Sequence, residues 1–167
     1  TDMTIGVVLG NGDGTFNAPA TYSTGAGRPW GLVAVDFNHD GKLDLASATS
    51  TGYLSLLLNL GSGTFGAAST FAGGTGGSAL VAADLNRDGN QDVAMVDQSG
   101  SGLQIFFGTG TGSFMAPTTY ALALGTRIVA LDIDHDGDLD LFAVGWNGVV
   151  DVERNDSCAK RQGVGGG

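Results

Sequence analysis

Cysteine and basic residues are scarce in this 167-residue chain. The single cysteine, Cys158, excludes an internal disulfide framework. Only seven lysines and arginines stand against 17 aspartates and glutamates, so the formal net charge is −10. Because phosphate groups attract a basic surface, this charge argues against nucleic-acid binding. No apolar run approaches the ~20 residues that a membrane-spanning helix needs.

Sustained helical periodicity is also absent, whereas glycine is abundant. The chain has 30 glycines, far above the usual share of about 7%. Short apolar segments rich in valine, leucine, alanine and threonine lie between glycine turns, as at 30–35, 43–48, 53–58 and 65–71. Such segments are typical of β-strands, so we predict an all-β chain with almost no helix.

An acidic motif of nine residues occurs three times, at 36–44, 84–92 and 132–140, with a constant spacing of 48. A glycine turn that ends in phenylalanine is interleaved with it, at Phe16, Phe65 and Phe114. Each period contains four predicted strands. Two interleaved repeats with about four strands per period predict β-propeller blades, about three of them per chain.

The acidic motif reads D-x-[DN]-x-D-G-x-x-D, with side-chain oxygens at positions 1, 3, 5 and 9. Calcium takes about six to eight oxygen ligands, and the main-chain carbonyl of position 7 could add one. Position 12 is not glutamate and the flanks are strands, which excludes an EF-hand. Transition metals are disfavoured because no cysteine belongs to the motif. The predicted ligands are Asp36, Asn38, Asp40, Lys42 and Asp44; Asp84, Asn86, Asp88, Asn90 and Asp92; and Asp132, Asp134, Asp136, Asp138 and Asp140.

A plain Asp/Asn/Gly turn is the competing interpretation of one such motif. Three copies at a fixed spacing favour metal binding instead. Eleven of the 17 acidic residues lie in the motifs, where crowded carboxylates repel each other without a cation. We therefore predict about three Ca²⁺ ions per chain, mainly as stabilisers, with the tightest site in the third motif.

The motifs and the glycine–phenylalanine turns together resemble the FG-GAP repeats of integrin α-subunit propellers and their bacterial and fungal relatives, called VCBS-type repeats. The resemblance covers about residues 5–155. The name-giving Phe-Gly pair occurs at 65–66, and Ala-Pro pairs occur at 18–19 and 116–117. The resemblance implies a calcium-stabilised propeller, extracellular or on the cell surface, that serves adhesion or binds glycans or proteins.

The chain departs from the family in the number of its repeats, because the family's propellers usually have six or seven blades. We assign 1–155 to the repeats and 156–167 to a glycine-rich tail. The chain opens at the third strand of one blade (4–9) and runs out after the third strand of another (149–153). We predict that two chains complete each other's end blades in a six-bladed ring. An open stack in a filament and a piece of a longer propeller are the alternatives.

The acidic motifs and the glycine–phenylalanine turns lie at one end of the predicted blades, so the loops at the opposite end are open to a ligand. Tryptophan and arginine there could stack on a sugar ring or anchor a protein. The competing interpretation is that the tryptophans fill gaps between blades. The candidate ligand-binding residues are Arg28, Trp30, Asp97, Arg127, Trp146 and Asn147.

Nothing in the sequence indicates catalysis. His39 and His135 occupy motif position 4, where the second copy has Arg87, which argues for a solvent-facing position rather than a general base. Asp151 and Glu153 alternate on one strand and cannot flank a glycosidic bond. We therefore expect a non-enzymatic recognition module. A self-assembling scaffold unit and an accessory domain of a polysaccharide-active enzyme are the alternatives.

Overall fold

The computed structural model describes residues 3–97, 99, 102–121, 126–144 and 150–153, without the side chains of the last four. Every regular element in this part of the chain is a β-strand, as the sequence predicts. All strand pairs are antiparallel. Glycine turns break the chain too often for a helix to form.

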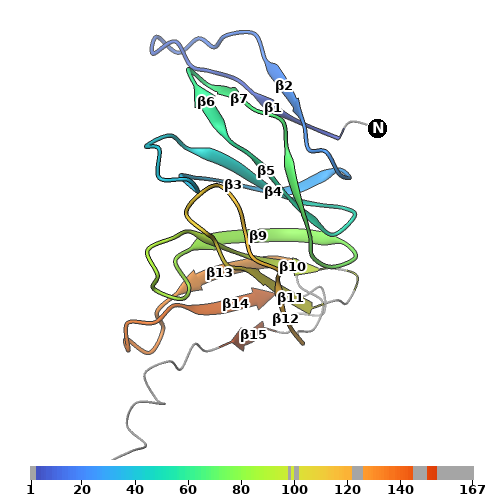
Figure 1. Ribbon diagram of the computed structural model, residues 1–167, viewed down its shortest axis with the longest axis vertical. Helices are drawn as coiled ribbons and strands as arrows, with labels where there is room; N and C mark the ends of the chain where they lie inside the picture. Colours follow the sequence, from blue (N-terminus) through green and yellow to red (C-terminus); the bar gives the residue numbers. More distant parts are fainter. Residues whose placement is uncertain (1–2, 98, 100–101, 122–125, 145–149, 154–167) are drawn as a thin grey trace, which may run out of the picture.

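Two four-stranded sheets form the centre of the molecule, and each corresponds to one sequence repeat (Figure 1). Their strand orders are β3-β4-β5-β8 and β9-β10-β11-β12, so neighbours in sequence pair with each other. The strands are β3 (Pro29–Val35), β4 (Asp44–Thr49), β5 (Tyr53–Leu57), β8 (Ser69–Ala72), β9 (Gly77–Ala83), β10 (Asp92–Asp97), β11 (Gly102–Phe106) and β12 (Thr118–Tyr120).

Smaller sheets flank the two central ones. The sequence repeat assigns β1 (Thr4–Val7) and β2 (Ala20–Ser23) to the third and fourth positions of a blade. It assigns β13 (Arg127–Leu131), β14 (Asp140–Val144) and β15 (Val150–Glu153) to the first three positions of another. A short hairpin pairs β6 (Asn59–Gly61) with β7 (Thr64–Phe65).

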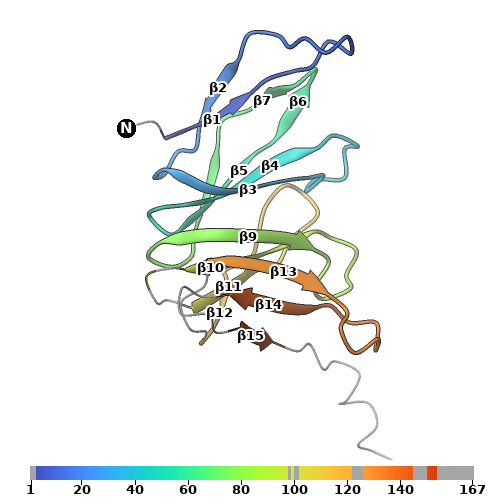
Figure 2. The same ribbon diagram turned by 180° about the vertical axis from the view of Figure 1, so that it is seen from behind.

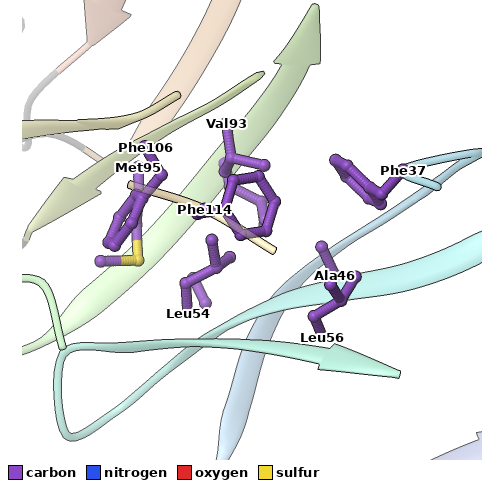
Figure 3. Close-up of a cluster of buried hydrophobic side chains, with 10 residues drawn as sticks. Phe37, Ala46, Leu54, Leu56, Val93, Met95, Phe106 and Phe114 are labelled. Atoms are coloured by element: carbon purple, nitrogen blue, oxygen red, sulfur yellow. The ribbon is translucent and has the colours of Figure 1, made fainter. Parts of the chain in front are cut away.

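The sheets stack face to face along the long axis of the molecule. Seen from behind, β9 lies between β3 and β13 (Figure 2). Each junction between sheets encloses an apolar cluster, and the cluster between the two central sheets includes Phe37, Met95, Phe106 and Phe114 (Figure 3). Because β4 and β10 are buried at every position, both faces of the central sheets are apolar rather than one.

Two of the repeated phenylalanines, Phe65 and Phe114, connect neighbouring sheets. Phe114 packs edge to face on Phe37 and Phe71 of the preceding repeat, with ring centroids 5.4 and 5.2 Å apart. Phe65 packs on Tyr22 in the same way, at 5.3 Å. Edge-to-face pairs of this kind are favoured by the charge distribution of aromatic rings.

One detail of the sequence prediction needs correction. The segment 65–71 is not one strand, because Phe65 ends the β6–β7 hairpin and 69–72 pairs with β5. At the two ends of the chain, β1 and β15 both hold the third-strand position, where the sequence places them. The described strands form an open stack of about three repeats, and they do not close a ring.

Gly52 fixes the turn between β4 and β5 against the next loop. Its φ is +78°, and a Cβ there would lie 2.1 Å from the carbonyl oxygen of Gly74. Its own carbonyl accepts a hydrogen bond of 3.0 Å from Gly73 N. Gly14 also has a positive φ, of +90°, but a Cβ there would meet no atom within 4 Å.

We expect Gly52→Ala to lower the free energy of unfolding by about 3 kcal/mol, through backbone strain and the clash with Gly74. The matched variant Gly14→Ala carries the strain alone and should lose only about 1 kcal/mol. Urea unfolding in one calcium buffer measures both. Equal losses in the two variants would contradict the close contact between these loops.

Candidate functional site

The three acidic motifs form loops that connect the first and second strands of successive sheets. They follow β3, β9 and β13, and Figure 1 shows them along one edge of the molecule, at the left. The glycine–phenylalanine turn at 108–114 lies at the same edge, because Gly112 N donates to the carbonyl of Phe37 in the first loop. The repeat therefore places the acidic loops of successive sheets along one edge of the molecule.

All three loops have the same backbone shape. Position 4 is left-handed, with φ of 59° at His39 and 61° at both Arg87 and His135. The glycine at position 6 is also left-handed, between +80° and +91°. A non-glycine residue in this region costs about 1–2 kcal/mol, so the surrounding contacts must hold the loop in this shape.

Backbone amides gather the side-chain oxygens of the first two loops. In the first loop, Asp36 Oδ1 and Asn38 Oδ1 both accept from Asp40 N, at 3.2 and 3.1 Å. In the second, Asp84 Oδ1 and Asn86 Oδ1 both accept from Asp88 N, at 3.1 and 3.0 Å. Sharing one donor brings the oxygens of positions 1 and 3 together, as a cation site requires.

The third loop brings three carboxylates together. Oxygens of Asp132, Asp134 and Asp136 all lie within 4.8 Å of one another. Asp132 Oδ2 accepts a 2.9 Å hydrogen bond from Gly137 N. Asp132 Oδ1 is buried and accepts no hydrogen bond within the described part of the chain. A buried carboxylate oxygen without a donor, beside two more carboxylates, fits a hard cation.

The aspartate at position 9 holds each loop through a hydrogen bond to its backbone. Asp44, Asp92 and Asp140 are buried and accept from the amide of position 2, at 3.0, 2.9 and 3.2 Å. The second oxygens of Asp44 and Asp92 accept from Asn59 N and Gly108 N, both at 2.8 Å. Each therefore connects its loop to the strand that precedes the glycine–phenylalanine turn or to the turn itself. These contacts were missed by sequence reasoning, which treated position 9 only as a ligand.

Two of the carboxylates at position 9, those of Asp44 and Asp92, lie in an unfavourable environment. Burial raises the pKa of Asp44 and of Asp92, and the neighbouring carboxylates at positions 1 and 5 raise it further. The hydrogen bonds from backbone amides act in the opposite direction. A carboxylate has about four lone-pair sites, so two amide donors still leave room for a cation.

Side chains at position 4 connect neighbouring loops. His39 Nε2 lies 3.1 Å from Asn90 Oδ1, and an Arg87 guanidinium nitrogen lies 2.9 Å from Asp138 Oδ1. Both contacts join position 4 of one loop to position 7 of the next. His39 and Arg87 are exposed, as the sequence predicts, but each also contacts the next loop, which the sequence does not indicate. The carboxylate of Asp138 is almost fully buried, so the Arg87 contact matters more than a surface ion pair.

Lys42, at position 7 of the first loop, bonds within its own loop. Its ammonium lies 2.7 Å from Asp40 Oδ2. This hydrogen bond is the main reason why the pKa of Asp40 is lowered. Both groups are accessible to solvent, so the ion pair is weak, and we expect it to separate readily when Asp40 binds a cation.

The candidate ligand-binding residues that the structure describes do not form one cluster. Arg28, Trp30 and Arg127 are exposed, but β3 and β13 lie on opposite sides of β9 (Figure 2). Asp97 is fully buried, so its assignment to a ligand-binding rim is wrong. Trp146 and Asn147 lie outside the described residues.

Asp97 stabilises the edge of the molecule opposite the acidic loops. It accepts from the amides of Thr75, Gly76 and Ser99, at 2.6, 3.0 and 2.6 Å, and from the Ser99 hydroxyl. Burial would raise the pKa of Asp97, but the hydrogen bonds from Ser99, Thr75 and Gly76 outweigh it and lower the pKa to about 2. The carboxylate therefore connects the loop between two sheets to a turn within one of them.

A lowered pKa means that the Asp97 carboxylate stabilises the fold above its unfolded pKa and loses this effect as the pH falls from about 4 to about 2. We expect Asp97→Asn to cost about 2 kcal/mol at pH 7, and the gap to wild type to shrink over that acid range. Thermal unfolding at several pH values measures this. Asp13→Asn, in an exposed turn, is the control. A gap that does not depend on pH would contradict the hydrogen-bond explanation.

Three overlapping segments of the chain match the family model described as FG-GAP-like repeat: 1–47, 36–95 and 84–143. The second and third matches each begin at the first residue of an acidic loop. No curated protein matches the chain. In the described residues, no helix is long and apolar enough to cross a membrane.

Proposed function

The chain belongs to the FG-GAP-like repeat family, and from this premise we propose that it is a calcium-binding β-propeller module for extracellular recognition or adhesion. The observation that carries the calcium proposal is the third loop, where three carboxylates converge and one buried oxygen of Asp132 has no hydrogen-bond donor among the residues that the structure describes. We propose no catalytic residue. The metal has a structural role.

The side chains at positions 1, 3, 5 and 9 of each loop would hold the ion, together with the main-chain carbonyl of position 7. Carboxylate and amide oxygens are the donors that calcium prefers, and the set contains no soft ligand. A bound divalent cation supplies charge compensation for the three or five carboxylates of each loop. About three ions per chain would offset more than half of the net charge of −10.

Contacts around the loops explain how a cation would stabilise the whole edge of the stack. Asp44 and Asp92 connect the loops to residues at or near the adjacent turns. His39 and Arg87 connect each loop to the next. Fixing one loop therefore restricts the turn beside it and the loop that follows.

We expect calcium to raise the melting temperature, because binding to the folded state alone adds about 2.7 kcal/mol at a concentration 100 times the dissociation constant. Asp134→Ala should remove about one of three sites. Asp13→Ala, outside the loops, should leave the number unchanged. Calorimetric titration and thermal unfolding of the EDTA-treated protein measure both quantities. A melting temperature that is indifferent to calcium and EDTA would refute the structural role.

We propose that recognition uses the edge of the molecule opposite the acidic loops, with a glycan or a protein as the ligand. Arg28 supports this, because it is exposed in the loop directly before β3, at the far end of that strand from the first acidic loop. A planar guanidinium can pair with carboxylates or stack on rings. Its position on a loop is common for binding residues.

Binding to a glycan array, followed by affinity measurement on any hit, tests this face. We expect Arg28→Ala to weaken binding about tenfold. Met115→Ala, an exposed position near the acidic loops, serves as the control. If Met115→Ala weakens binding and Arg28→Ala does not, the ligand binds at the edge of the acidic loops, which would contradict this proposal.

A self-assembling scaffold unit is the second candidate function. Large apolar side chains are exposed at both ends of the stack, and soluble proteins rarely leave such surfaces uncovered. In this case the partner would be another copy of the chain, either in a closed six-bladed ring or in a filament.

A further inference from the structure

Two exposed apolar surfaces lie at opposite ends of the sheet stack. The first faces away from β9 on the β3 side, and we call it the N-side face. The second faces away from β9 on the β13 side, and we call it the C-side face. The N-side face consists of Val8, Phe16, Trp30 and Leu32; the C-side face consists of Tyr120, Val129, Ile133 and Val144.

The repeat shows that positions of the N-side face are buried elsewhere in the same chain. Leu32 is 52% exposed, whereas its equivalents one and two periods later, Leu80 and Ile128, are 9% and 8% exposed. Phe16 is 68% exposed, whereas Phe114, at the equivalent position, is 8% exposed. Inside the stack, a preceding sheet covers these positions.

Positions of the C-side face are likewise buried at their equivalents in earlier repeats. Ile133 is 46% exposed, whereas its equivalents Phe37 and Leu85 are buried. Val144 is exposed, whereas its equivalent Val96 is fully buried. Inside the stack, a following sheet covers these positions. Each outer face is therefore one half of a junction that the chain already forms within itself.

The internal junctions also show which residues would meet. Leu80 packs in one cluster with Val33 and Ala46 of the preceding sheet. The repeat equivalents of these three are Leu32, Val129 and Phe142. Leu32 on the N-side face therefore fits against Val129 and Phe142 on a C-side face.

The aromatic contacts give a second matching pair. Phe65 packs on Tyr22, and Phe114 packs on Phe71, with nearly equal centroid distances. Shifting the first pair back by one period places Phe16 against Tyr120. Both of these rings are exposed.

We propose that the N-side face of one copy of this chain binds the C-side face of a second copy, head to tail. In the joined sheet, β1 of one copy lies beside β14 of the other, at the place that β15 holds in this structure. Two such junctions close a ring of two copies and six blades. The inference deepens the proposed scaffold function and does not depend on calcium or on a glycan.

Sedimentation velocity of the calcium-loaded chain from about 1 to about 100 µM tests the proposal. We expect the mass of two copies. Leu32→Asp and Val129→Asp should each raise the dissociation constant at least about 100-fold, because each buries a carboxylate in the junction. Leu60→Asp is the matched control, since Leu60 is exposed and its equivalents Asn11 and Thr109 are exposed too. The control should associate like the wild type.

Mixing the two variants identifies the direction of association. A head-to-tail pair of Leu32→Asp and Val129→Asp chains keeps one intact junction, so the mixture should associate although neither variant does alone. A contact between two N-side faces would leave Val129→Asp unaffected and would overturn the proposal. A wild-type monomer at about 100 µM would overturn it as well.

A cross-link keeps the proposal testable if an aspartate variant does not fold. In a Cys158→Ser background, Phe16→Cys and Tyr120→Cys chains are mixed and treated with a short bis-maleimide. Covalent pairs should form only between the two different chains, and their absence would contradict the pairing. Calcium titration of the same samples reads the metal sites separately. A monomer that still binds calcium would overturn the proposed association of two copies and leave the calcium proposal intact.

Discussion

Mutual repulsion of carboxylates on three short loops is the constraint on which the rest of this structure depends. Eleven acidic side chains lie in 27 motif positions, and in the first two loops backbone amides hold the aspartate oxygen of position 1 toward the asparagine oxygen of position 3. Such a cluster is unfavourable without a cation. Burial of Asp44 and Asp92 increases this cost, as the raised pKa of both groups indicates. The loops therefore have a geometry that a divalent cation would stabilise.

The loops and the sheets support each other because the connections run along the stack. A central sheet such as β9–β12 is apolar on both faces, so it is stable only between two neighbours. The contacts from His39 to Asn90 and from Arg87 to Asp138 join the same neighbours at their edge. Stacking and loop order are thus two parts of one cooperative arrangement, as in other repeat proteins.

The sequence contains the strands, the repeat and the loop positions, because short apolar segments between glycines are local signals. Contacts between repeats have no local signal. His39 meets Asn90 across a sheet junction, and nothing near His39 in the sequence indicates it. Asp97 resembles an exposed loop aspartate until Thr75 and Gly76 of the preceding loop donate to it. The break after Phe65 depends equally on tertiary packing, since that ring turns toward Tyr22.

Anomalous diffraction from crystals grown in calcium would test the central claim most directly. The account predicts one strong calcium peak in each of the three loops, about 2.3–2.6 Å from the side-chain oxygens of positions 1, 3, 5 and 9. It also predicts the highest occupancy in the loop of Asp132, which has the most carboxylates. Loops that keep the same shape with only water between their carboxylates, at millimolar calcium, would contradict it.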